Sequence, residues 1–75
     1  MKVQVHLYGE FQKSAGLRDL CLEMEEKSTA DDIFKKLRLP KTIYKMFLVN
    51  GIRVNDDWPV KDGDEVHIFQ PVGGG

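Results

Sequence analysis

The feature that most constrains the fold is a strict alternation of apolar and polar residues at the start of the chain. Valine and leucine side chains alternate with polar ones from Lys2 to Tyr8. Successive side chains of a strand point to opposite faces, so this pattern indicates a strand with one buried face. A second alternating run, from Arg18 to Glu25, predicts an antiparallel partner. We expect the segment between them, residues 9–17, to be a loop, which makes the pair a hairpin.

A helix is predicted in the middle of the chain. Thr29 can accept hydrogen bonds from the first turn, and Asp32, three residues later, completes a pair that resembles a capping box. Pro40 cannot continue a helix and is expected to end this one. The apolar residues follow the spacing i, i+3, i+4 and i+7, and they are Ala30, Ile33, Phe34 and Leu37. This stripe gives the helix one face for a core.

The remaining strands are predicted from turn residues and apolar runs. Asn50-Gly51 separates the apolar runs 46–49 and 52–54. Asparagine and glycine tolerate a positive φ, so the pair is a strong signal for a tight hairpin. A turn at residues 61–64 precedes a last strand, residues 65–70. There Val66 and Ile68 are expected to face inward, and His67 and Phe69 outward.

The order of elements is therefore β-β-α-β-β-β, which predicts an α+β roll with one main helix across one face of a mixed sheet. In such a roll the first and last strands are central, parallel neighbours joined through the helix. With 75 residues the chain has room for one core. We expect a domain over residues 1–72 and a tail over residues 73–75.

The tail consists of Gly73, Gly74 and Gly75. Glycine loses more backbone entropy on ordering than any other residue and has no side chain to bury. We therefore expect the tail to be mobile and to project from the fold. Because it lacks Cβ atoms, it can enter a narrow channel and present the Gly75 carboxylate to the active site of another protein. A frayed end without a function is the alternative.

Composition excludes several classes of function. The net charge of −1 argues against binding to nucleic acid or to an anionic membrane. A single cysteine, Cys21, excludes an internal disulfide and a site with several cysteine ligands. We expect a cytoplasmic protein, since neither a signal peptide nor an apolar run of membrane-spanning length is present.

Two histidines are candidates for a site. His6 and His67 occupy outward positions on strands that are predicted to be neighbours. Two imidazoles can bind a metal ion, but a complete site needs three or four protein ligands and the sequence indicates no third one. We therefore predict no metal site. Together with Tyr8 and Phe69, the histidines are expected to form a docking face for other proteins. Ordinary scatter of surface residues is the alternative.

Other side chains offer little chemistry. Cys21 can be a sulfur relay or an inert residue; the latter is favoured, since its acidic neighbours would raise the pKa of a thiol. Neither a Ser/His/Asp arrangement nor a phosphate-binding loop is present. Five acids lie near the last strand: Asp56, Asp57, Asp62, Asp64 and Glu65. They either steer a basic partner or form a solvated rim. A self-contained enzyme is not expected.

The segment from Lys61 to Gly75 resembles the end of the MoaD/ThiS family of ubiquitin-like β-grasp sulfur carriers. The resemblance rests on the turn D-G-D-E-V, on the aromatic Phe69 before the tail and on the terminal Gly-Gly. Val49-Asn50-Gly51 resembles the hairpin of this family, and the strand order covers the whole chain. Gln70-Pro71-Val72 looks closer to the small subunit of molybdopterin synthase than to the thiamine carrier, whereas the short length leans towards the thiamine carrier.

The resemblance implies a carrier protein, not an enzyme, that binds no cofactor itself. A partner of the ubiquitin-activating type would use ATP to adenylate the Gly75 carboxylate. A persulfide sulfur donor would then convert it to a thiocarboxylate for molybdenum cofactor biosynthesis, on the large subunit of molybdopterin synthase. Gly74 and Gly73 would provide clearance. Phe69 would contact partners, together with the rest of the docking face and the adjoining Pro71 and Val72.

Three alternatives are kept. A carrier of the ThiS type would deliver sulfur to thiazole synthase for thiamine formation. A protein modifier would end in an isopeptide bond from Gly75 to a lysine. A β-grasp binding module would have a tail without a function.

Overall fold

The computed structural model describes residues 1–42 and 44–71. The elements in chain order are β1 (Lys2–Leu7), α1 (Gly9–Ala15), β2 (Asp19–Glu23), α2 (Ala30–Lys36), β3 (Met46–Val49), β4 (Ile52–Val54) and β5 (Glu65–Phe69). The predicted α+β class and the positions of the predicted strands are confirmed.

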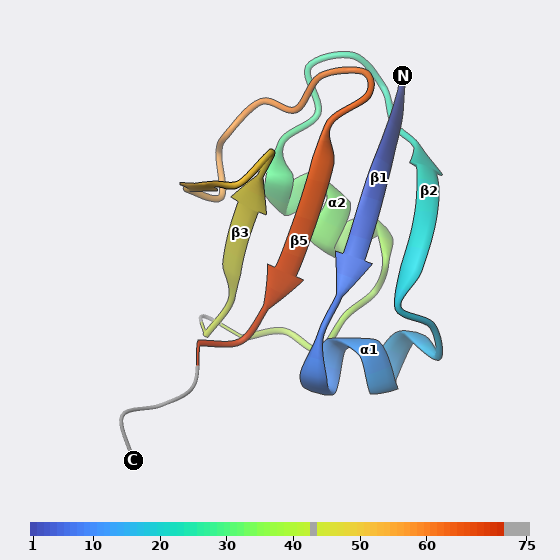
Figure 1. Cartoon of the computed structure of the whole chain (residues 1–75), viewed down its shortest axis with the longest axis vertical. Coiled ribbons are helices and arrows are strands. Elements are labelled where there is room, and N and C mark those ends of the chain that lie inside the picture. The colour runs from blue at the N-terminus through green and yellow to red at the C-terminus, as the bar shows by residue number, and fades with distance from the viewer. Residues whose placement is uncertain (43, 72–75) are drawn as a thin grey trace.

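The strands form one mixed sheet in the order β2-β1-β5-β3-β4 (Figure 1). β1 and β5 are parallel and central, whereas β1–β2, β5–β3 and β3–β4 are antiparallel pairs. The predicted parallel pairing of the first and last strands is therefore confirmed. Helix α2 crosses one face of the sheet, and α1 lies beyond its lower end in the view of Figure 1. In the described part of the chain, no helix covers the opposite face.

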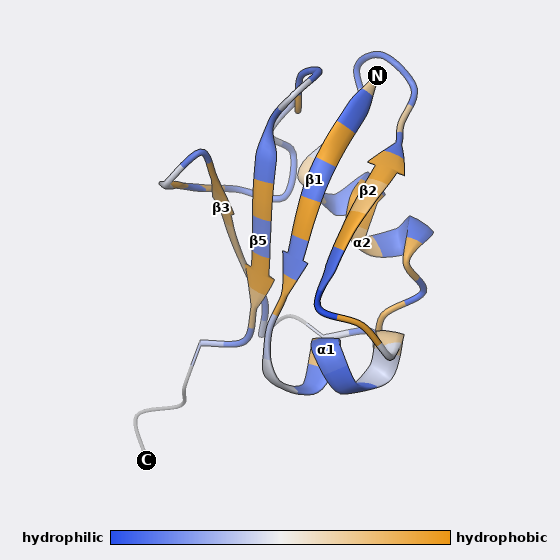
Figure 2. Ribbon diagram, turned by 45° about the vertical axis from the view of Figure 1, so that its right-hand side comes forward, coloured by the Kyte–Doolittle hydropathy of each residue, from blue (hydrophilic) through white to orange (hydrophobic). Residues whose placement is uncertain are grey.

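The core lies between the sheet and α2, and it follows from the alternation in the strands. Figure 2 shows apolar and polar residues alternating along β1 and β5. The inward side chains of both strands are fully buried, and they are Val3, Val5, Leu7, Val66 and Ile68. Phe34 of α2 packs edge-to-face against Phe11, with ring centroids 5.3 Å apart, and against Phe47, at 6.3 Å. These contacts fix the helix against one face and leave the other to solvent.

The loop predicted over residues 9–17 is wrong in part, because it contains helix α1. Phe11 is fully buried and anchors this helix to the core. Gly16 ends it with φ of 77°, and its N–H donates to the carbonyl oxygen of Gln12, 2.9 Å away. A glycine in the left-handed region is a common end of a helix. A single glycine in the predicted loop does not reveal the seven residues of helix before it.

The start of α2 is as predicted. The amide N–H of Asp32 donates to Thr29 Oγ1, and that of Thr29 donates to Asp32 Oδ2, at 3.2 and 2.8 Å. This reciprocal pair is a capping box. The helix ends earlier than Pro40 requires: its last residue is Lys36, and Arg38 adopts a positive φ of 54°.

The Asn50-Gly51 turn joins β3 to β4 and also holds the start of β5. Both residues have positive φ, 51° and 84°, as the sequence predicts. Asn50 Nδ2 donates to Asp64 Oδ1, and the amide N–H of Glu65 donates to Asn50 Oδ1, each at 2.9 Å. This turn therefore helps to fix the place where the Glu65 side chain enters the exposed face.

The boundary between the predicted domain, residues 1–72, and the predicted tail, residues 73–75, lies outside the described residues and stays a prediction. Over residues 1–42 and 44–71, none of the helices has the length and apolar character needed to cross a membrane.

The capping box of α2 gives a test of the fold. Thr29→Ala removes the side-chain acceptor at the helix start, so we expect the free energy of unfolding to fall by about 1 kcal/mol. Urea unfolding measures this change. Thr29→Ser keeps the hydroxyl and should retain most of the stability; equal losses in both variants would contradict a capping role.

Candidate functional site

The exposed face of the sheet gathers the aromatic residues that the sequence singled out. His6 of β1 and His67 of β5 are register partners, so their side chains stand next to each other on the same face. Tyr8 follows β1 and Phe69 ends β5, each two residues further along the same alternation. We call His6, Tyr8, His67 and Phe69 the docking face. The parallel pairing of the two central strands is what brings them together.

The rings of the docking face pack in one continuous row. His6 stacks on His67 with centroids 4.5 Å apart, and His67 stacks on Tyr8 at 5.8 Å. Tyr8 meets Phe69 edge-to-face, also at 5.8 Å. The Tyr8 hydroxyl oxygen lies 2.8 Å from His67 Nδ1, a hydrogen bond that ties the row together. The row is thus an ordered aromatic surface, of the kind that suits a protein partner.

An open groove runs beside this row towards the end of the chain. Its lining residues are Tyr8, Gly9, Glu10, Leu48, Gly51, His67, Phe69, Gln70 and Pro71. Tyr8 is 40% exposed, and the side chains of His67 and Phe69 are half-buried. Because Gln70 and Pro71 belong to the lining, the groove leads from the sheet to the residues that precede the glycines. A partner seated here would contact the base of the tail.

His6 makes a separate set of contacts at the other end of the row. Its Nδ1 lies 2.8 Å from Asp19 Oδ1 on β2, and its Nε2 lies 3.9 Å from Glu65 Oε2. A carboxylate only accepts hydrogen bonds, so the Nδ1–H of His6 donates to Asp19. This hydrogen bond is the main cause that lowers the pKa of Asp19 from its usual value of 3.8, and the charge of Arg18 adds to it. Asp19 is therefore held in its ionised form.

The structure describes some of the predicted site residues and not others. It brings His6, Tyr8, His67 and Phe69 together, and it places Pro71 at the groove; their role in binding a partner stays a prediction. The other predicted residues, Val72, Gly73, Gly74 and Gly75, lie outside the described part of the chain.

Leu48 and Gly51 line the groove, but sequence reasoning did not assign them to the site. Leu48 is the register partner of His67 across the β3–β5 pair. Its apolar run gave no alternation from which to infer an outward side chain. Finding Leu48 would have required the order of the strands in the sheet, since β3 lies next to β5 and Leu48 is opposite His67.

The Asp19–His6 hydrogen bond predicts a dependence of stability on pH. The pKa of Asp19 is lower in the folded than in the unfolded chain, so ionised Asp19 stabilises the fold above pH 3.8. That contribution is lost as the pH falls through the lowered pKa. The Asp19→Asn variant cannot ionise at this position and so lacks the contribution at every pH. The wild type should therefore be the more stable protein above the lowered pKa, and the difference in free energy of unfolding should shrink as the pH falls through it.

Urea unfolding at a series of pH values below 5 would measure this difference. Asp57→Asn, which removes a carboxylate elsewhere on the surface, serves as the matched control. A difference between the wild type and Asp19→Asn that stays constant with pH would contradict the assignment.

Comparison with known families gives a match over most of the chain. The sequence model described as "ThiS family" matches residues 5–75. No curated protein matches the sequence.

Solved structures share the fold at low sequence identity. SAMP1 from Haloferax volcanii, a small archaeal modifier protein, has a TM-score of 0.81 and 20% identity, and the alignment covers 100% of both chains. The putative molybdopterin converting factor subunit 1 from Pyrococcus furiosus has a TM-score of 0.79 and 24% identity, covering 96% of this chain and 99% of that one. At these identities the similarity establishes the fold alone, and it confirms the predicted ubiquitin-like β-grasp.

A third structure is a complex of subunits 1 and 2 of the molybdopterin-converting factor from Helicobacter pylori. The matched chain has a TM-score of 0.67 and 20% identity, with 100% of both chains covered.

Proposed function

The chain belongs to the ThiS family of ubiquitin-like sulfur carriers, and from this premise we propose that it carries sulfur for the synthesis of molybdopterin. The observation that carries the proposal is the family match, which extends through Gly75 and so includes the Gly-Gly that the chemistry uses. The reacting group is the Gly75 carboxylate. The folded domain contributes recognition by its partners.

The proposed chemistry has three steps, which take place on partner proteins. A carboxylate oxygen of Gly75 attacks the α-phosphorus of ATP; pyrophosphate leaves, and an acyl adenylate forms. The terminal sulfur of a persulfide on a sulfur donor then attacks the acyl carbon and displaces AMP. Reductive cleavage of the resulting acyl disulfide by a thiol leaves a thiocarboxylate on Gly75 and a disulfide on the donor side. The carrier binds no cofactor of its own, since the activating enzyme uses the ATP.

Two observations favour molybdopterin over thiazole as the destination of the sulfur. Gln70-Pro71-Val72 resembles the small subunit of molybdopterin synthase, and Pro71 lines the groove next to the docking face. The fold matches, over nearly whole chains, a putative molybdopterin converting factor subunit 1 and a chain of a complex between subunits 1 and 2 of such a factor. The large subunit of the synthase is then the partner that receives the thiocarboxylate. A ThiS-type carrier that serves thiazole synthase is the alternative within this family.

The docking face and its groove give partners a way to hold the tail. The aromatic row offers an apolar surface, and the groove continues to Gln70 and Pro71, immediately before the residues that must enter an active site. A partner that binds the row therefore directs the glycines into its own channel. We place this recognition in the cytoplasm, where ATP-dependent activation takes place.

A protein modifier is the second candidate function, and the similarity to SAMP1 favours it. Both functions begin with adenylation of the terminal carboxylate, and they differ in the acceptor. A modifier forms an isopeptide bond with a lysine of another protein, whereas a carrier releases sulfur to a small molecule. Immunoblots of host extract distinguish them: a ladder of conjugates indicates the modifier, and a single free species indicates the carrier.

Threading of the glycines through a channel can be tested at Gly74. Gly74→Leu adds a branched side chain that a narrow channel would exclude, so adenylation should fall at least tenfold while folding is unchanged. The rate of ATP–pyrophosphate exchange catalysed by the activating enzyme measures the first step. A normal rate would contradict the threading argument, and an unchanged thermal unfolding curve would exclude an effect on folding.

Phe69 is the expected anchor of the docking face. Phe69→Ala removes the ring that packs on Tyr8 and lines the groove, so binding to the activating enzyme or to the large subunit should weaken by about 1–3 kcal/mol. Isothermal titration calorimetry measures the dissociation constant. Leu17→Ala is the control, since Leu17 is 43% exposed but lies outside the groove lining. Equal effects of the two substitutions would remove Phe69 from the interface.

A further inference from the structure

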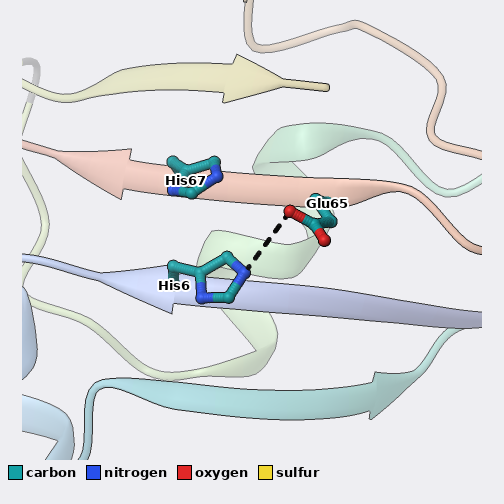
Figure 3. Close-up of side chains that lie close together, drawn as sticks. All are labelled: His6, Glu65 and His67. Carbon is teal, nitrogen blue, oxygen red and sulfur yellow. Dashed lines mark ion pairs between the residues drawn. The ribbon is translucent and has the colours of Figure 1, made fainter. Parts of the chain in front are cut away.

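We propose that His6, Glu65 and His67 form a binding site for one zinc ion on the exposed face of the sheet. His6 and His67 are register partners on the parallel strands β1 and β5. Glu65 lies two residues before His67, so its side chain emerges on the same face, one step along the strand. Figure 3 shows the three side chains grouped above the two strands, with Glu65 reaching towards His6. The sheet itself therefore holds three ligands of two types that zinc accepts, two imidazoles and a carboxylate.

The distances among the three groups are close to those of a zinc site. One potential ligand atom from each residue lies within 4.8 Å of the others, and His6 Nε2 is 3.9 Å from Glu65 Oε2. Tetrahedral zinc with ligand bonds of about 2.0–2.1 Å needs donors roughly 3.4 Å apart. The distance to Glu65 shortens when its side chain, which is 58% exposed, rotates. The two imidazoles, now stacked with centroids 4.5 Å apart, must also turn so that one nitrogen of each points at the ion. The strands that carry the two imidazoles do not have to move.

The hydrogen bonds around His6 leave the correct nitrogen free to bind a metal. Because Nδ1–H donates to Asp19, the neutral ring has its lone pair on Nε2, the atom that faces Glu65. Histidines that bind metals usually donate their other N–H to a carboxylate or a similar acceptor, which fixes the ring and raises its basicity. Asp19 is placed to do this for His6.

His67 has an equivalent arrangement. Its Nδ1 lies 2.8 Å from the Tyr8 hydroxyl oxygen, which can accept the Nδ1–H, and Nε2 then carries the lone pair. Both imidazoles are thus oriented by a partner on one nitrogen, and each offers the other nitrogen. The contacts that hold the docking face together are therefore compatible with a ligand on the second nitrogen of each ring.

His6 Nε2 supplies an independent observation. It is buried, and among the described residues it has no hydrogen-bond partner. The separation from Glu65, 3.9 Å, is too long for a hydrogen bond. A buried nitrogen without a partner is costly and calls for an explanation, and a bound ion is one that would satisfy it. A zinc ion between Nε2 and Glu65 would satisfy both groups.

The absence of a third ligand was the reason to predict no metal site from the sequence. The structure supplies that ligand in Glu65, which the sequence analysis had grouped with the acids near the last strand. Two imidazoles and a carboxylate form the ligand set of many zinc sites with three protein ligands, and a fourth position stays open.

Zinc titration of the full chain without a histidine tag tests the site. The protein, zinc chloride and a competing chromophoric chelator are mixed at pH 7.5, and the absorbance of the chelator reports free zinc. We expect one ion per chain. His6→Gln and Glu65→Gln should each weaken the affinity at least tenfold, and Asp57→Asn should leave it unchanged. Asp57 is the matched control, since it is an exposed acid outside the cluster.

Asp19→Asn tests the contribution of the carboxylate that orients His6. It keeps a hydrogen-bond acceptor for His6 but loses the carboxylate, and changes of this kind cost roughly 10–100-fold in metal affinity. Rising zinc should also increase the melting temperature of the wild type, because the ion binds only the folded site. The melting temperature of His6→Gln should not respond to zinc.

The proposal is overturned if zinc binding does not saturate at one ion per chain. It is also overturned if His6→Gln and Glu65→Gln, shown to be folded by circular dichroism, bind zinc as tightly as the wild type. The test does not involve the activating enzyme or the thiocarboxylate, so its outcome is independent of the proposed function.

Discussion

The parallel pairing of β1 with β5 is the interaction on which both the core and the site depend. Its inward residues, Val5 and Val66 among them, are fully buried against α2. Its outward residues include His6 and His67, which the same register places side by side. A shift of one residue along either strand would exchange the two faces, so burial of the valines fixes the position of the histidines. Hydrophobic burial on one side thereby orders a polar and aromatic surface on the other.

This surface has two halves with different physical character. Towards the end of the chain, Tyr8 and Phe69 border a groove that reaches Pro71. Towards the start of β5, His6 and Glu65 bring together a buried nitrogen and an exposed carboxylate. His67 belongs to both halves, stacking on His6 and bonding to Tyr8. A carrier needs only the half with Tyr8 and Phe69 to direct its glycines. A bound metal ion would explain the other half, where His6 and Glu65 lie together.

Much of the fold could be predicted because its signals are local. The alternation of β1, the capping box of α2 and the Asn50-Gly51 turn each fix a few neighbouring residues, and all three are confirmed. Helix α1 was missed because Phe11 is its one buried residue, so the segment shows no apolar stripe at helical spacing. The site was predictable where one pairing decided it, as for His6 and His67. Glu65 shares the local alternation of His67, but it was grouped with the nearby acids instead of with the histidines. Leu48 depends on the order of the strands, which no local pattern shows.

The central claim is that Gly75 accepts sulfur, and the intact mass of the full chain tests it most directly. The protein would be incubated with ATP, a persulfide donor, a thiol reductant and the activating enzyme of its host, and then examined by mass spectrometry. The account predicts a species heavier by the exchange of one oxygen for one sulfur, which reverts on mild hydrolysis. An unchanged mass, under conditions in which the same enzyme converts another carrier, would contradict it.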